Sequence, residues 1–193
     1  MTRLAILLVA LTSVSSAADQ AAPATLGADR IAAAISEGTS AKKVEAPHIT
    51  IKTWGIVATA PIYVFASTPF SRVLFAASEA KRTYRTFAAT DVTPEMLADT
   101  LVLSAQPLVL KFDERISTPQ HLVLDCGGKI TQPSEEKVST DDLTNGFGAK
   151  RQVAGVISTF PLGALQPACI VRVITDRGEK VISAADLSKT VLR

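Results

Sequence analysis

The sequence predicts a mainly β protein: an antiparallel β-sandwich with one covering helix at about residues 69–85 and a short N-terminal helix at about residues 28–37. Three observations predict this class. About seven short segments combine β-branched or aromatic residues with the alternation typical of strands. Turn-forming residues separate these segments. The chain also lacks the regular strand–helix alternation of a parallel sheet.

Composition and charge describe an ordinary globular domain. The 193 residues carry 20 Lys and Arg against 18 Asp and Glu, a net charge of +2, and 47% are hydrophobic. A nucleic-acid-binding domain would be strongly basic, so we expect no nucleic-acid partner. The expected organisation is a signal peptide at residues 1–18, a tail with the short helix at 19–46, and a single β-rich domain at 47–193.

The first residues have the pattern of a secretory signal peptide. A short positive start ends at Arg3, residues 4–11 are all apolar, and residues 13–18 are mostly small. We therefore expect a bacterial exported protein, periplasmic or secreted, whose mature chain starts at Ala18 or Asp19. No later stretch reaches 18 consecutive apolar residues, so we expect no transmembrane segment in the mature chain.

Local signals place the helices. Gly38 is expected to stop the helix at residues 28–37. In the next helix Thr68 suits the N-cap and Pro69 the first helical position. A third helix start is expected at Pro94. The covering helix has an apolar stripe at Phe70, Val73, Leu74, Ala77, Ala80 and Tyr84.

Most of the remaining chain is strand-like. Pro61 indicates an edge strand or a bulge, and Gly127-Gly128 is a hairpin turn signal. Residues 133–151 are polar and are expected to form a long loop with one helical turn near residues 142–147. The strand-like segments are residues 49–51, 56–66, 101–105, 108–112, 121–126, 153–160, 169–175 and 180–183.

The strand count favours an immunoglobulin-like sandwich, but the hallmarks of that family are missing. Trp54 precedes both cysteines, and Pro167, not a tyrosine, stands two residues before Cys169. Cys126 and Cys169 each lie on the apolar face of an expected strand. Because an exported chain meets an oxidising environment, we expect these two cysteines to form a disulfide.

Three stretches of the helical region resemble a segment of uncharacterised exported bacterial proteins. They are Thr68-Pro69-Phe70-Ser71-Arg72-Val73, Ala77-Ser78-Glu79-Ala80-Lys81-Arg82 and Asp91-Val92-Thr93-Pro94-Glu95-Met96-Leu97. The resemblance covers about 30 residues and implies a shared exported domain without an assigned activity. It implies no catalytic residue.

The sequence offers no coherent catalytic or metal-binding set. His48 and His121 are the only histidines, and His121 and Asp125, which share a strand face, are too few ligands for a metal. A calcium loop at residues 141–152 fails at Leu143 and at its twelfth position. No nucleophile elbow, phosphate loop or dinucleotide fingerprint occurs. We therefore predict no catalytic residue, no metal ligand and no cofactor.

One aromatic side chain is a candidate contact site. On a helical wheel Phe75 falls away from the apolar stripe, among Arg72, Glu79 and Arg82. Either the N-terminal helix covers it, or it is an anchor in a polar rim. The first explanation is favoured, because lone aromatics more often find their own core. Nearby, a basic cluster with two aromatics either touches an anionic surface or is a solvated helix end: Lys81, Arg82, Tyr84, Arg85 and Phe87.

Two functions remain open. The first is an exported, non-enzymatic domain that binds a protein or an envelope component, and a stabilising subunit is indistinguishable from it by sequence. The second is a secreted hydrolase whose polar groups converge only in three dimensions. A pocket lined by His48 or His121 with a serine and an acid would favour the hydrolase, and an exposed apolar patch would favour the binding domain.

Overall fold

The computed structural model describes residues 26–42, 44, 48–51, 61–109, 115–144, 148, 150–164 and 169–183. The elements in chain order are α1 (Ala28–Ser40), β1 (His48–Ile51), β2 (Ile62–Ser67), α2 (Pro69–Arg82), η1 (Ala89–Asp91), α3 (Pro94–Leu97), β3 (Thr100–Pro107), β4 (Pro119–Cys126), β5 (Lys129–Thr131), β6 (Glu135–Thr144), β7 (Lys150–Pro161), η2 (Leu162–Ala164), β8 (Cys169–Thr175) and β9 (Gly178–Ser183).

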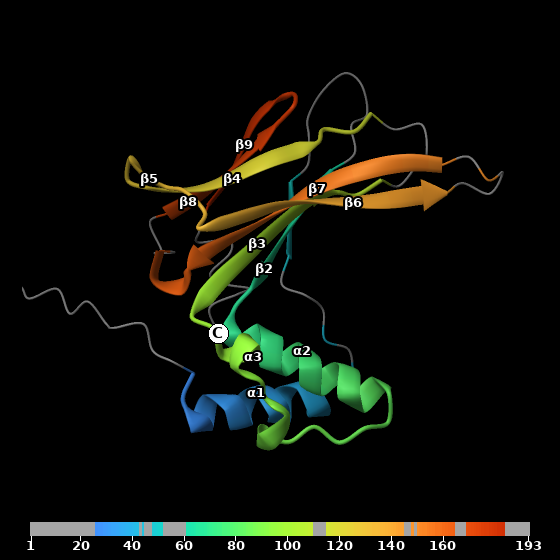
Figure 1. Ribbon diagram of the computed structural model, residues 1–193, viewed down its shortest axis with the longest axis vertical. Helices are drawn as coiled ribbons and strands as arrows, with labels where there is room; N and C mark the ends of the chain where they lie inside the picture. Colours follow the sequence, from blue (N-terminus) through green and yellow to red (C-terminus); the bar gives the residue numbers. More distant parts are fainter. Residues whose placement is uncertain are drawn as a thin grey trace, which may run out of the picture.

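The strands form two antiparallel sheets, as the sequence predicts (Figure 1). One sheet has the order β1-β2-β3-β7-β6 and the other the order β5-β4-β8-β9. Their facing sides share one apolar core, in which the largest fully buried side chains are Phe160, Ile62, Leu101, Leu103, Leu122 and Leu124. The prediction of a mainly β, antiparallel sandwich is confirmed, and the immunoglobulin-like variant stays a prediction.

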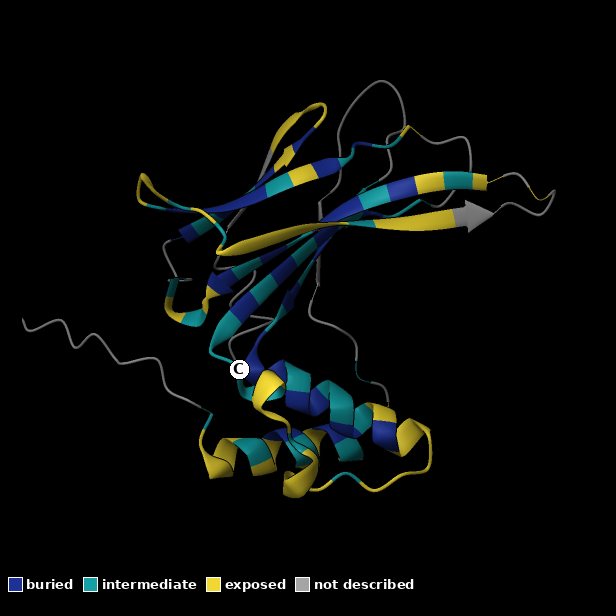
Figure 2. Ribbon diagram, viewed as in Figure 1, coloured by how far each residue is buried: buried dark blue, intermediate teal, exposed yellow. Residues whose placement is uncertain are grey.

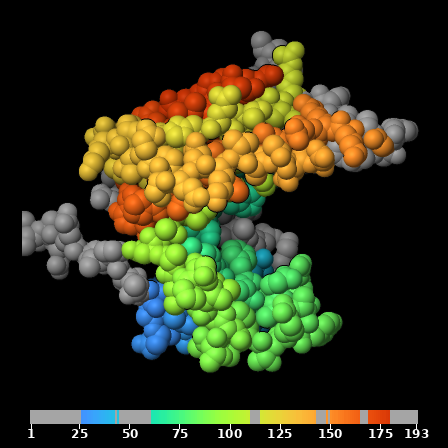
Figure 3. All heavy atoms as spheres, viewed as in Figure 1, coloured from blue at the N-terminus to red at the C-terminus, as the bar shows by residue number. Residues whose placement is uncertain are grey.

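The helices form a layer of their own at one end of the sandwich, below the ends of β2 and β3 (Figures 1 and 3). α1 packs on α2 around a second apolar cluster, whose buried members are Ala34, Val73 and Leu74. Figure 2 shows the buried faces of both helices turned toward one another. α2 therefore covers one end of the sandwich, and its apolar stripe packs against α1.

Gly38 does not stop α1, which runs on to Ser40. A Cβ atom at this position would collide with the carbonyl oxygen of Leu74 and with Cβ of Ala77 on α2. The glycine is therefore explained by the close approach of the two helices, a constraint that the sequence of α1 alone does not reveal.

The start of α2 follows the sequence prediction. Ser71 donates its backbone N–H to the Thr68 hydroxyl at 3.3 Å, and the Ser71 hydroxyl accepts the Thr68 N–H at 2.9 Å. This reciprocal capping box satisfies two donors at the helix start. The expected end at about residue 85 lies slightly beyond the observed one, because α2 closes at Arg82 with a left-handed residue at Tyr84.

The predicted loop at residues 133–151 is also wrong. Most of it belongs to a long hairpin of β6 and β7, in which Glu135 pairs with Thr159 and Thr144 with Lys150. β6 is an edge strand, and charged residues are common on such edges because they discourage pairing with other chains. Its polar sequence therefore marks exposure at a sheet edge, which the alternation test for half-buried strands does not detect.

A proline, a glycine pair and the two cysteines are the other local features for which the sequence made a prediction. Pro61 lies just before β2, an interior strand, so the edge expectation is wrong. Gly127 and Gly128 form the turn between β4 and β5 with φ of 67° and 90°. Cys126 and Cys169 are register partners of β4 and β8 and form the predicted disulfide. The signal-peptide and Trp54 predictions lie outside the described residues. In the part of the chain that is described, no helix is long and apolar enough to cross a bilayer.

Candidate functional site

A hollow of about 370 Å³ lies where α1 and α2 end. The Lys81 ammonium near the end of α2 donates to the carbonyl of Ala41, just after α1, at 3.0 Å. The two helices therefore run in the same direction and end side by side. We call this feature the helix-end hollow. Its lining combines apolar, charged and small polar residues: Ala41, Lys42, Val44, Phe75, Ser78, Glu79, Lys81, Arg82 and Tyr84.

Phe75 is half-buried and lies on the hollow. Its ring packs against the cluster of Ala34, Val73 and Leu74, against which Ile31 and Ile35 of α1 also pack. The covering by α1 that the sequence favours is therefore seen for part of the side chain. The rest of the ring contributes apolar surface to the helix-end hollow.

Arg72 does not share this surface with Phe75 and Arg82. Its guanidinium donates to the Ala98 carbonyl at 2.7 Å and to the Thr100 carbonyl at 2.8 Å, and so joins α2 to the start of β3. Burial lowers the pKa of the Arg72 guanidinium. The helical wheel places Arg72 beside Phe75, but these hydrogen bonds direct its guanidinium toward the start of β3, because a helical wheel ignores the carbonyl groups that lie beside the helix.

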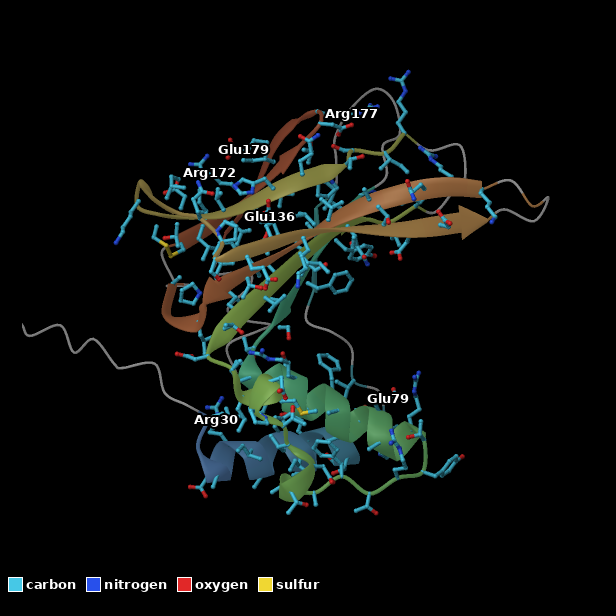
Figure 4. The ribbon with its side chains drawn as sticks, in the orientation of Figure 1. Arg30, Glu79, Glu136, Arg172, Arg177 and Glu179 are labelled. Carbon is cyan, nitrogen blue, oxygen red and sulfur yellow. A yellow bond between two sulfur atoms is a disulfide. The ribbon has the colours of Figure 1, made fainter. Side chains whose placement is uncertain are left out.

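Arg82 lies on the rim of the hollow. Its side chain is 79% exposed and forms an ion pair with Glu79 at 2.9 Å. Exposed pairs of this kind stabilise a helix by about 0.3–0.5 kcal/mol, so the pair leaves both groups available to another partner. Glu79 lies near the C-terminal end of α2 (Figure 4).

Tyr84 is the most unusual residue of this region. Its side chain is 100% exposed and its φ is 55°, in the left-handed region that favours glycine. The Arg85 N–H donates to the Ala80 carbonyl at 2.8 Å and the Tyr84 N–H to the Lys81 carbonyl at 3.0 Å, which together make a Schellman motif. A left-handed conformation costs a residue with a Cβ about 1–2 kcal/mol. The sequence pattern that places Tyr84 on the apolar stripe is therefore wrong.

The charge at the helix-end hollow is modestly positive. Lys42, Lys81 and Arg82 line it against the single carboxylate of Glu79. The two helix C-termini add about −0.5 charge each. The sum is about +1, which suits one carboxylate beside an apolar group better than a polyanion.

A second polar cluster joins the two sheets and contains the groups that a hydrolase would need. The His121 Nδ1 lies 2.7 Å from Glu136 Oε1, and the Ser158 hydroxyl donates to Glu136 Oε2 at 2.7 Å. In serine hydrolases the imidazole stands between the hydroxyl and the carboxylate. Here Glu136 stands between Ser158 and His121, and Ser158 is 0% exposed. The cluster therefore lacks an activated, accessible nucleophile.

His121 and Asp125 share a strand but hold different partners. Asp125 pairs with Arg172 of β8 on the outer side of the four-stranded sheet, where Arg172 also pairs with Glu179 of β9 (Figure 4). Hydrogen bonds from Arg172 and from the Gly128 N–H hold the pKa of Asp125 below its usual value. Among the described residues, no group of three or more potential ligands is arranged to hold a metal ion.

The structure also places the aspartates of the calcium-loop candidate and the second histidine. Asp141 and Asp142 lie in β6, so the described start of the loop that a calcium site would need is a strand. His48 begins β1, and its side chain lies outside the described part. The sequence did not indicate that Glu136 and Ser158 meet His121, because no spacing rule links a strand on one sheet to a strand on another.

Comparison with protein-family models, with curated proteins and with solved structures found no match. The resemblance of residues 68–97 to exported bacterial proteins therefore stays a prediction.

Proposed function

We propose that this chain is an exported, non-enzymatic domain that binds a partner protein at the helix-end hollow. The partner segment carries a carboxylate beside an apolar side chain. Export is supported by the N-terminal sequence pattern and is compatible with the Cys126–Cys169 disulfide.

The observation that carries this proposal is the conformation of Tyr84. A large aromatic side chain is held fully in solvent at a backbone position where glycine costs less. Strain of this kind persists where the surroundings impose it, and it is a reason to look for function. Tyrosine is also enriched among the residues that dominate binding interfaces.

The shape and charge of the hollow favour a protein segment over a membrane or a free anion. A volume of about 370 Å³ lies at the lower end of ligand-binding clefts, about 300–1,000 Å³. A bilayer surface does not fill a concave site, and the Glu79 carboxylate on the rim would repel anionic headgroups. Lys81 donates to the Ala41 carbonyl and Arg82 pairs with Glu79, so the two cationic groups are directed at different places and do not converge on one small anion.

The hydrolase alternative is not favoured. Its requirement was a histidine with a serine and an acid in an accessible pocket, and Ser158 of the His121 cluster is fully buried. Its hydroxyl proton is directed at Glu136, so the imidazole does not receive it.

Binding of defined peptides tests the proposal. The probe is a fluorescent nine-residue peptide of Ser and Gly with one Asp beside a central leucine, called the acidic peptide; the same peptide with Lys in place of the Asp is the peptide control. We expect saturable binding of the acidic peptide only, weakened about fivefold by Lys42→Glu, which reverses one charge on the hollow. Lys129→Glu on β5 is the matched control and should leave binding unchanged.

Two further arms separate other partners. Vesicles with phosphatidylglycerol in phosphatidylcholine test a membrane surface, and inorganic phosphate as a competitor tests a small-anion site. Peptide binding without vesicle binding supports the proposal. If vesicles bind, peptides do not, and Tyr84→Ala abolishes vesicle binding, the partner is a membrane surface and the proposed protein partner is contradicted. Equal binding of acidic and basic peptides would contradict the proposal.

A further inference from the structure

The chain changes sheets between β5 and β6, and among the described residues this crossing leaves the first part of one β4 edge without a strand partner. β5 pairs only with the last part of β4, from Leu124 to Cys126. Residues 132–134 then lead into β6 of the other sheet. In the described part of the chain the Leu122 N–H therefore has no strand partner on that side, and it donates to Glu136 Oε2 at 3.2 Å.

The Glu136 carboxylate holds this corner together. It accepts from the Leu122 N–H and from His121 of β4, and from the Ser158 hydroxyl of β7 at 2.7 Å. One side chain thus joins strands of both sheets, and Figure 4 shows Glu136 between them. Hydrogen bonds to a charged acceptor are about twice as strong as those between neutral groups.

Both nitrogens of the His121 ring face oxygen atoms. Nδ1 lies 2.7 Å from Glu136 Oε1, and Nε2 lies 2.8 Å from Gln132 Oε1. An ionised carboxylate and an amide oxygen can only accept, so this arrangement, with the Gln132 oxygen facing Nε2, suits the ring that carries a proton on both nitrogens. A neutral ring keeps one N–H, and its bare Nε2 then requires Gln132 to turn its amide over.

We propose that His121, Glu136 and Gln132 form a pH-responsive clasp that closes the β4–β6 corner when His121 is protonated and loosens it when His121 is neutral. This device is independent of the proposed binding function, because it lies in the sandwich and the helix-end hollow lies among the helices.

Among the described charged residues near the clasp, Glu136 is the one that contacts His121, because the others are paired elsewhere. On β6, Glu135 pairs with Lys137. On the four-stranded sheet, Arg172 of β8 pairs with both Asp125 of β4 and Glu179 of β9. The register partner of His121 on β8 is Ile174, and the partner of Glu136 on β7 is Ser158, so these two strands place uncharged residues opposite the clasp.

The pKa directions agree with this geometry. Burial lowers the pKa of His121, but the hydrogen bonds to Glu136 and Gln132 and the charge of Glu136 outweigh it, so the pKa lies above 6.5. Burial raises the pKa of Glu136, but hydrogen bonds from Ser158, His121 and the Leu122 N–H outweigh it, so the pKa lies below 4.5.

The signs define a pH window. The contribution of His121 is complete below its unfolded pKa of 6.5 and is lost as pH rises through its folded pKa. The contribution of Glu136 is complete above its unfolded pKa of 4.5 and is lost as pH falls through its folded pKa. The clasp is therefore strongest between these two unfolded values and weakens toward alkaline pH.

Two measurements on the full folded chain test the clasp. Proton NMR of the histidine rings gives the pKa of His121, with His48→Asn to assign the second histidine. Amide hydrogen exchange of Leu122, corrected for intrinsic rates, then compares protection at about pH 5.5 and about pH 8.5, with Val171 of β8 as a reference amide. Each unit by which the pKa of His121 exceeds its value in the open state predicts about a tenfold loss of Leu122 protection.

Variants separate the clasp from general stability. Glu136→Gln should lower the pKa of His121 and abolish the pH step in Leu122 protection. His121→Gln, which retains an amide donor but does not titrate, should also abolish the step. Ser158→Ala removes one hydrogen bond and leaves the titrating pair, so it should lower protection but keep the step. A His121 pKa at or below 6.5, or the same step in His121→Gln as in the parent chain, would overturn the proposal.

Discussion

Replacing Tyr84 by glycine should change stability and binding in opposite directions. The left-handed backbone of Tyr84 costs about 1–2 kcal/mol, which glycine relieves. Glycine in turn loses about 0.5–1 kcal/mol through the greater freedom of the unfolded chain. The ring is 100% exposed, so its removal sacrifices no packing. We expect Tyr84→Gly to gain about 0.5–1 kcal/mol and the midpoint of thermal unfolding to rise by about 1–4 °C.

The same substitution should weaken the binding of the acidic peptide. If Tyr84 is an anchor, loss of its ring costs about 2 kcal/mol or more, which is about thirtyfold in Kd. Unfolding by calorimetry and binding by fluorescence anisotropy, on the same preparation, measure the two effects.

Two companion variants separate the ring from the backbone. Tyr84→Ala removes the ring but keeps the strained conformation, so binding should fall while stability stays within about 0.5 kcal/mol of the parent. Tyr84→Phe keeps the ring and should retain most binding. A loss of 1 kcal/mol or more in Tyr84→Gly would show that the ring packs on the protein, and unchanged peptide binding in both variants that remove the ring would refute its role as an anchor.

Four further outcomes follow from the structure. Phe75→Ala should cost about 2 kcal/mol, less than the 3–5 of a fully buried ring, and should weaken peptide binding; unchanged values of both would remove Phe75 from the site. Gly38→Ala should lower the unfolding midpoint, because the added methyl collides with α2, and a neutral result would contradict the close helix approach. Cys126 and Cys169 should resist alkylation without reductant, and loss of either should cost about 2–5 kcal/mol. Intact mass of exported material should give a chain starting at residue 18 or 19, whereas a retained Met1 would contradict export.

The parts of the fold that local chemistry determines could be predicted from the sequence. The start of α2 at Thr68 and Pro69 depends on capping and on a proline that suits the first turn. The turn at Gly127 and Gly128 depends on positive φ angles that glycine adopts freely. The Cys126–Cys169 pair follows from two strands that both turn an apolar face inward.

The failures have a common cause in contacts between distant segments. Gly38 resembles a helix stop until α2 is seen to pass close to it. The polar run of β6 resembles a loop until β7 pairs with it. Arg72 resembles a surface contact until the carbonyl groups of Ala98 and Thr100 are found beside it. Each case is decided by a partner that no local window contains.

The candidate site was predictable only in part. The sequence identified Phe75 and the basic end of α2, because aromatic and charged residues stand out on a helical wheel. It could not identify the hollow, which exists because α1 and α2 run in the same direction and end together. The left-handed Tyr84 also carries no sequence signal, since glycine and asparagine are the residues that normally mark such a position.

The most direct test of the proposed function is to map the acidic peptide on the folded chain by ¹⁵N-edited NMR titration. The account predicts that the amide shifts concentrate at residues 41–44 and 75–85, saturate with one peptide per chain, and fall away in Tyr84→Ala. Saturable shifts that concentrate on the exposed edge of β6, or no shifts at peptide concentrations up to about 1 mM, where a bound complex would be worth about 4 kcal/mol, would contradict binding at the helix-end hollow.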